Sequence, residues 1–305
     1  MHARIKLLLA AFVGMVLASA LSAYGQQLPT VSGPNGKLSV EGGSSADEGE
    51  GVATGSFAMP LAPWLGVQAD GAVGSVDDAT LGGGALHLFT RDPLSYLLGF
   101  YGSYHTWNST DIWRAALEGE LYLGRVTLEG LAGYESVDAP DVINGFAVLT
   151  LDDDHLFGQV DAAYYITDDF KVYAGYRYIN ETSFGAAGAE YLIRGYEVPV
   201  SLFARGDFGD EDFNSITGGL KVYLSPDADK SLIDRHRRDD PKVYAPTFPT
   251  LATRNPLPTN VPQCSTSGSL VLSPTTGNCI WPAGSAIAGQ KPNLSGGGGY
   301  FCSKL

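Results

Sequence analysis

The sequence has little cysteine, little basic charge and, after its first 23 residues, no long apolar run. Only 3 of its 305 residues are Cys, and 19 Lys and Arg stand against 33 Asp and Glu, a formal charge of −14. Such an acidic chain repels phosphate backbones, so we do not expect it to bind nucleic acid. No later segment approaches the roughly 18 consecutive apolar residues of a membrane helix. This absence still leaves strands as a way across a membrane.

The N-terminus has the features of an export signal. A basic start precedes the apolar run Leu7–Leu17, and small residues follow up to Ala23. This pattern predicts a cleaved signal peptide over residues 1–23 rather than a membrane anchor, because the run is short for a bilayer-spanning helix. Residues 24–36 then read as a polar leader. Residues 227–305 form a tail that is rich in Pro, Ser and Gly and contains all three cysteines.

Between these parts, residues 37–226 alternate polar and apolar side chains, which predicts strands. In Leu117–Leu123, for example, leucines share one face with Gly119, and Glu118, Glu120 and Tyr122 share the other. No helical interval separates the segments, so neighbouring strands are expected to be antiparallel. Turn residues divide the block into thirteen candidate strands: 37–45, 51–61, 63–75, 79–90, 94–106, 111–124, 125–137, 142–151, 155–167, 170–180, 184–195, 198–207 and 213–224.

Alternation alone does not distinguish a membrane barrel, with its apolar side outward, from a soluble secreted β-sandwich. Three features favour the membrane. Most segments reach the length of about 9–11 residues that a tilted spanning strand needs. Tyrosines cluster between Tyr96 and Tyr223, many near segment ends where membrane barrels place aromatic girdles. The polar faces carry charges of both signs, which can pair across an enclosed lumen.

A lipid-facing Arg or Lys costs about 2–4 kcal/mol at the bilayer midplane, so charged strand residues must face inward if the barrel is in a membrane. We therefore predict a charged lumen that sets selectivity or plugs the barrel. Its predicted residues are Glu118, Glu120, Glu129, Asp161, Arg177, Glu190, Arg194 and Arg205.

The segment Thr217–Leu224 resembles the assembly signal of outer-membrane barrels. Val67–Gly71, Leu86–Phe89 with Arg91–Pro93, and Ser231–Pro241 resemble a poorly characterised alphaproteobacterial family of Gram-negative, porin-like outer-membrane barrels. The resemblance implies an all-β, antiparallel up-and-down transmembrane β-barrel with an irregular C-terminal tail, located in the bacterial outer membrane. Its implied partners are outer-membrane lipid, lipopolysaccharide and the barrel assembly machinery. Since bacterial single-chain barrels have even strand numbers, about 12 strands are expected, with 10 as the alternative.

The tail contains two further candidate sites. Arg235, Arg237 and Arg238 are predicted either to dock on lipid or lipopolysaccharide phosphates at a rim, or to pair with neighbouring aspartates in a solvated exit segment. A disulfide between Cys264 and Cys279 would close a loop of about 15 residues, with a stabilisation of roughly 3 kcal/mol. The spacings match no metal motif, and we expect no cofactor.

The sequence favours a structural or porin-like function, with cations preferred if the lumen conducts. One alternative is a surface interaction or adhesion protein that uses its acidic loops and tail. Another is a lipid-modifying enzyme built on Ser103 and His105, with Glu118 or Glu120 one strand away. No Gly-x-Ser-x-Gly elbow is present, so we do not expect an enzyme.

Overall fold

The computed structural model describes part of the chain, in two compact units. The described residues are 28–45, 48–76, 78–107, 110–138, 142–143, 146–147, 153–195, 197–209, 214–225, 227–244, 271–272 and 279–280. The first unit comprises Met1–Asp138 and Asp152–Thr253, and the second comprises Ala139–Leu151 and Arg254–Leu305. The predicted signal peptide lies outside the described residues.

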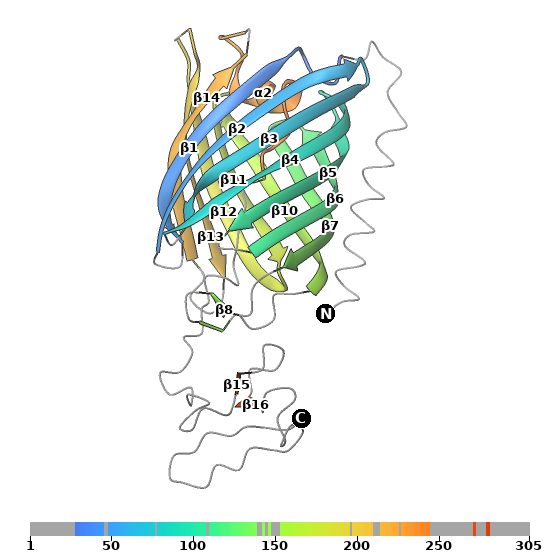
Figure 1. The fold of residues 1–305 in the computed structure, drawn as a ribbon. Coiled ribbons are helices and arrows are strands. Elements are labelled where there is room, and N and C mark those ends of the chain that lie inside the picture. The colour runs from blue at the N-terminus through green and yellow to red at the C-terminus, as the bar shows by residue number, and fades with distance from the viewer. Residues whose placement is uncertain are drawn as a thin grey trace. The chain divides into compact units, whose positions relative to one another are not determined.

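Twelve antiparallel strands close into a barrel in the first unit (Figure 1). They are β1 (Asn35–Ser45), β2 (Glu48–Ala62), β3 (Leu65–Val76), β4 (Ala79–Asp92), β5 (Tyr96–Trp107), β6 (Thr110–Leu123), β7 (Val126–Asp138), β10 (Asp153–Thr167), β11 (Phe170–Ile179), β12 (Thr182–Ile193), β13 (Val200–Gly209) and β14 (Asn214–Leu224). The ring closes where β1 pairs with β14, from Gly36 opposite Leu224 to Ser45 opposite Ser215. The predicted twelve-stranded, up-and-down all-β barrel is confirmed, and its closure pairs both edges of every barrel strand.

The second unit contains two short hairpins among its described residues. Strand β8 (Val142–Ile143) pairs with β9 (Phe146–Ala147), and β15 (Val271–Leu272) pairs with β16 (Cys279–Ile280). The predicted barrel strand over 142–151 is therefore wrong. Its apolar run contains Asn144-Gly145, a dipeptide that favours a two-residue hairpin turn, so the segment pairs with itself. Without this segment, the thirteen candidate strands are reduced to the twelve strands of the barrel.

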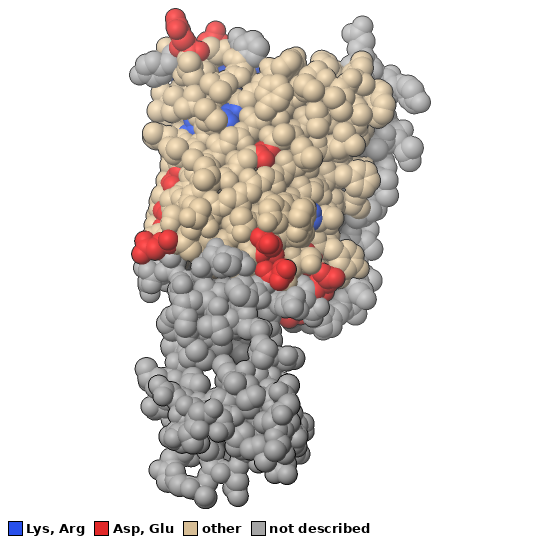
Figure 2. All heavy atoms as spheres, viewed as in Figure 1, with Lys and Arg blue, Asp and Glu red and all other residues tan. Residues whose placement is uncertain are grey.

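The outer wall of the barrel is apolar. On β6, Leu117 is 45% exposed and Leu123 58% exposed, whereas Glu118 and Glu120 between them are buried. Other strands repeat this pattern, with Phe100 among their large exposed outward side chains. The face in Figure 2 accordingly carries few charged atoms across the strands, and acidic residues gather at its two ends. Each strand therefore presents its apolar side outward and its polar side to the interior.

The two ends of the barrel differ in their connections. We call one end the turn end: β1 begins there, β14 ends there, and connections of two to six residues, the longest of them between β12 and β13, join its strands. The other is the loop end, where the connection from Asp138 to Asp153 is the longest between consecutive barrel strands.

After β14 the chain turns back into the barrel. Helix α2 (Leu232–Arg238) begins at Ser231, whose hydroxyl accepts a hydrogen bond from the Asp234 backbone N–H, a standard N-cap. The helix lies within the turn end of the barrel (Figure 1). No helix among the described residues is long and apolar enough to cross a membrane. We call Lys230–Tyr244 the plug; its helix was not predicted, since the sequence indicated an irregular tail, whereas residues 239–244 have no regular secondary structure.

Candidate functional site

The interior wall is unusually rich in buried ionisable side chains. Each comes from the inward-facing positions of a strand and is at most 9% exposed: Lys37, His87, Arg91, His105, Arg114, Glu118, Glu120, Glu129, Glu135, Asp161, Lys171, Arg177, Glu190 and Asp207. Burying a charge is costly unless an opposite charge and hydrogen bonds accompany it. The geometry of these pairs therefore decides what the lumen can do.

Asp161 and Arg177 form a two-pronged pair between β10 and β11. Arg177 Nη1 donates to Asp161 Oδ1 at 2.6 Å and Nη2 donates to Oδ2 at 3.0 Å. Gly175 makes room for them, since a Cβ there would lie 1.7 Å from Asp161 Oδ1. Parallel hydrogen bonds of this kind fix both groups in position as well as neutralising them.

Glu190 is the centre of a second cluster, on β12. Lys221 Nζ donates to its Oε2 at 2.8 Å, and the Tyr223 hydroxyl donates to its Oε1 at 2.6 Å. A third cluster reaches across β14, where Arg205 of β13 donates to both oxygens of Glu41 on β1 at 3.0 and 2.9 Å.

The two predicted carboxylates of β6, Glu118 and Glu120, have a histidine and a tyrosine as hydrogen-bond partners. His87 Nδ1 lies 2.8 Å from Glu118 Oε2, and its Nε2 lies 3.0 Å from Asp70 Oδ2, so the ring bridges two strands. Glu120 accepts a hydrogen bond from the Tyr122 hydroxyl at 2.9 Å. Both predicted residues thus lie on the interior wall.

The plug is fixed to the wall by oppositely charged side chains. Lys242 Nζ donates to Glu129 Oε1 at 2.7 Å and makes a short contact with Asp161. Across the lumen, Lys37 pairs with Asp240 and donates to the Pro241 carbonyl at 3.0 Å. Although burial opposes it, Glu129 and Asp161 hold the pKa of Lys242 above its ordinary value, so this lysine stays charged.

Within α2, His236 connects the plug to two wall tyrosines. Its Nδ1 lies 2.8 Å from the Tyr165 hydroxyl and its Nε2 lies 3.2 Å from the Tyr223 hydroxyl. Since Tyr223 donates to Glu190, the neutral Nε2–H tautomer satisfies the whole chain of hydrogen bonds. Burial, followed by the nearby Lys171, lowers the pKa of His236 well below its ordinary value, which agrees with a neutral ring.

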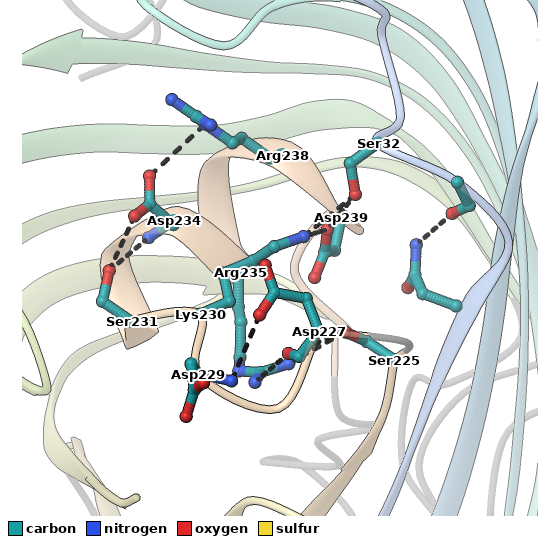
Figure 3. A network of polar contacts seen from close by, with 12 residues as sticks. Ser32, Ser225, Asp227, Asp229, Lys230, Ser231, Asp234, Arg235, Arg238 and Asp239 are labelled. Atoms are coloured by element: carbon teal, nitrogen blue, oxygen red, sulfur yellow. Dashed lines mark hydrogen bonds and ion pairs between the residues drawn. The ribbon is translucent and has the colours of Figure 1, made fainter.

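The structure differs from the predicted lipid rim at the tail arginines. Arg235 is fully buried and donates to the Ser225 hydroxyl and the Asp227 carbonyl (Figure 3). Arg237 donates to the Val126 carbonyl at 3.1 Å, inside the turn end. Only Arg238 is substantially exposed, at 43% of its side chain, and it pairs with Asp234 as the alternative interpretation expected. The helix turns Arg235 and Arg237 toward the barrel interior, a placement that charge content alone did not indicate.

The remaining predicted site residues fall elsewhere. Arg194 lies beyond the end of β12 with 43% of its side chain exposed, and it pairs with Asp169 at the turn end instead of facing the lumen. Cys264 and the side chain of Cys279 lie outside the described residues. Glu118, Glu120, Glu129, Asp161, Arg177, Glu190 and Arg205 all occupy the interior wall.

Several interior residues were missed. Lys37 and Glu41 alternate with the outward Leu38 and Val40, so the alternation rule applied to β1 would have found them. Lys242 had no comparable signal, because its segment has no period that places it in a lumen.

The proposed enzyme arrangement is not assembled. Ser103 and His105 are both buried on β5, but Ser103 Oγ has no hydrogen-bond partner among the described residues. Glu118 is bound to His87 instead. No group of three or more His, Cys, Asp and Glu in the described part of the chain could hold a metal ion.

No family model and no curated protein matches this chain. Among solved structures it is similar to the KdgM porin (7% identity, 62% of this chain and 98% of that chain, TM-score 0.43). It is also similar to the COG4313 outer membrane channel from Pseudomonas putida (11% identity, 67% and 99%, TM-score 0.44) and to outer membrane phospholipase A from Escherichia coli (15% identity, 69% and 97%, TM-score 0.41). Because these values are low, the fold rests on the strand pairing described above.

Proposed function

We propose that the protein is a porin-like barrel of the bacterial outer membrane, whose charged lumen is closed by its own plug. The observation that carries the proposal is the polarity of the strands: exposed side chains such as Leu117 lie outside, and ionised pairs such as Asp161–Arg177 lie inside. In water this arrangement would expose apolar surface and bury charge, both unfavourable. In a bilayer the same outer wall contacts acyl chains.

The plug explains how such a barrel is kept from leaking. A twelve-stranded barrel lies between filled eight-stranded barrels and the open sixteen-stranded porins, so its lumen holds an additional segment. Lys242 contributes a positive charge between Glu129 and Asp161. Without it, the wall carboxylates would favour cations over anions during small-solute passage.

The partners follow from this location. The outward apolar side chains contact outer-membrane lipid, with lipopolysaccharide in the outer leaflet. The assembly machinery binds the end of β14, where Leu220 and Leu224 are exposed on the outer wall and Tyr223 faces inward.

Single-channel conductance of the full-length protein in planar bilayers tests the proposal. We expect the wild type to show small or no current steps. Lys242→Glu places three acidic groups together and should expel the plug, giving steps several-fold larger that favour cations. Arg125→Glu is the matched control, because it makes the same charge change at an exposed turn-end residue, 48% exposed at its side chain.

Large steps from Lys242→Glu alone would support solute passage through a plugged lumen. Silence from all three proteins, after they are shown to insert, would contradict solute passage and leave a purely structural barrel. Equal steps from all three would show that the plug does not limit the lumen.

A further inference from the structure

The contacts of the plug advance in one direction along the wall. On β7, Arg237 contacts Val126 and Lys242 contacts Glu129, five plug residues further on. Tyr244 then packs in a cluster with Leu131. Since β7 runs from the turn end toward the loop end, each step carries the chain further from the end at which it entered.

Strand β10 gives an independent measure of the same path. This strand runs in the opposite direction, and its contacts appear in reverse order: Tyr165 with His236, Asp161 with Lys242, and Phe157 with Tyr244. Phe157 is only four residues from Asp153, where β10 begins at the loop end. By Tyr244 the chain has thus advanced from the turn end to about the middle of the barrel, as measured on β7, and somewhat further as measured on β10.

Between Asp240 and Lys242 the plug also spans the width of the lumen. Asp240 contacts Lys37 on β1, and Lys242 contacts Glu129 on β7. In the ring order, β1 and β7 are six strands apart in either direction, so they lie on opposite walls. A chain that turned back toward the turn end would have to pass beside residues that already bridge both walls.

The remaining distance to the loop end is one that the rest of the chain can cover. Seven residues separate Leu131 from Asp138 at the end of β7. At about 3.3 Å per residue and a strand tilt of about 40°, they cover roughly 17 Å along the barrel axis. An extended chain covers that distance in about 5–6 residues, and 61 residues follow Tyr244 in the 305-residue chain.

We propose that the chain beyond Tyr244 leaves the barrel through the loop end, so that its C-terminal part is presented on the opposite side of the membrane from Asn35. The inference rests on the proposed membrane location but not on conduction. Turns in outer-membrane barrels are short on the periplasmic side and loops are longer outside. The barrel therefore delivers its own C-terminal segment to the cell surface, where that segment is available to external partners.

The three native cysteines allow a test on the unmodified chain. All of them, Cys264, Cys279 and Cys302, follow Tyr244. Intact cells that express the protein in their outer membrane are treated with a mild reductant and then with a maleimide coupled to a polyethylene glycol too large for porins. We expect the gel shift in intact cells to equal the shift after the outer membrane is permeabilised.

Two control variants, in which the native cysteines are replaced by Ser, report the two ends of the barrel. Glu181→Cys places a thiol at the loop end, between β11 and β12, and Arg125→Cys places one in the turn between β6 and β7, where the side chain is 48% exposed. The native thiols should be labelled as Glu181→Cys is and not as Arg125→Cys is. If the native thiols are instead labelled only under the conditions that label Arg125→Cys, the inference is overturned and the proposed barrel function still stands. Equal labelling of both controls in intact cells would overturn the membrane location as well.

Discussion

Many buried charges of the interior wall are satisfied in pairs and clusters, whereas the guanidinium of Arg91 has no hydrogen-bond partner among the described residues. Asp161 accepts from Arg177 and contacts Lys242, and Glu190 accepts from Lys221 and Tyr223. Removing one member of such a cluster leaves an unpaired charge, which costs more than the net stabilisation of the intact cluster.

His236 should make docking of the plug depend on pH. Its pKa in the folded protein is lower than its ordinary value of 6.5. The unfolded state then binds more protons below about pH 6.5, so stability is fully present above this pH and is lost as pH falls toward the folded-state pKa. We expect the heat-unfolding midpoint in detergent to fall between pH 7 and 5, with a loss of at most about 1.4 kcal/mol per pH unit.

His236→Gln provides the comparison, since Gln can donate and accept hydrogen bonds without titrating in this range. The variant should show a flatter pH profile over the same interval. The charged or ionisable groups near this ring that would otherwise contribute are Glu190, Lys171, Lys221, Lys37, Tyr165 and Tyr223. An unchanged slope in His236→Gln would show that groups other than His236 cause the pH dependence.

At the residue scale, the sequence predicted side-chain direction well and partner choice poorly. Glu129 and Arg205 were expected to face inward because a charge facing lipid is costly, and they do. Which cation neutralises Glu129 was not predictable, because Lys242 comes from a segment without periodicity. Arg194 was misplaced because the alternation was extended one residue beyond the end of β12.

At the element scale, close strand packing depends on glycine at a few interior positions. A Cβ on Gly133 of β7 would lie 2.0 Å from the Ala115 carbonyl oxygen and 2.5 Å from Ala116 Cα. These are backbone atoms of β6, and they cannot move without disturbing the pairing of the two strands.

Gly133→Ala should therefore reduce the yield of folded barrel, measured as the heat-modifiable band on a gel. Gly71→Ala is the control: it is also a strand glycine, but a Cβ there meets no atom within 4 Å. We expect a loss of at least half of the folded band for Gly133→Ala and little change for Gly71→Ala. Equal yields would show that the contact between β6 and β7 relaxes easily.

Strands with a clear alternation of polar and apolar residues were predictable from the sequence. Elements whose structure depends on the side chains packed around them were not. Twelve of the thirteen candidate strands lie in the barrel because a half-buried strand must alternate. The segment 142–151 has enough apolar residues for a strand, yet its described residues form β8 and β9, which pair with each other and not with the barrel. Helix α2 has seven residues and lies among wall side chains, so its sequence alone predicted an irregular tail.

At the scale of the whole molecule, the barrel reverses the usual distribution of polarity. Its largest exposed side chains are apolar, and its fully buried side chains include Arg91 and Arg235. A protein with this distribution is stable only if the surrounding medium is itself apolar around the strands and polar at the two ends. The effect of a new charge on the outer wall should therefore depend on its depth.

Two leucines on the outer surface make this depth dependence measurable. Leu86, in the middle of β4, is 62% exposed, and Leu94, in the turn between β4 and β5, is 69% exposed. In a bilayer, Leu86→Arg should destabilise the barrel by about 2–4 kcal/mol and Leu94→Arg by about 0–1 kcal/mol. In water, two equally exposed positions would tolerate Arg equally. The free energy of folding into lipid vesicles, measured at equilibrium for both variants, gives the difference. Similar small effects at both positions would mean that β4 does not face acyl chains. The protein would then be a soluble secreted β-protein.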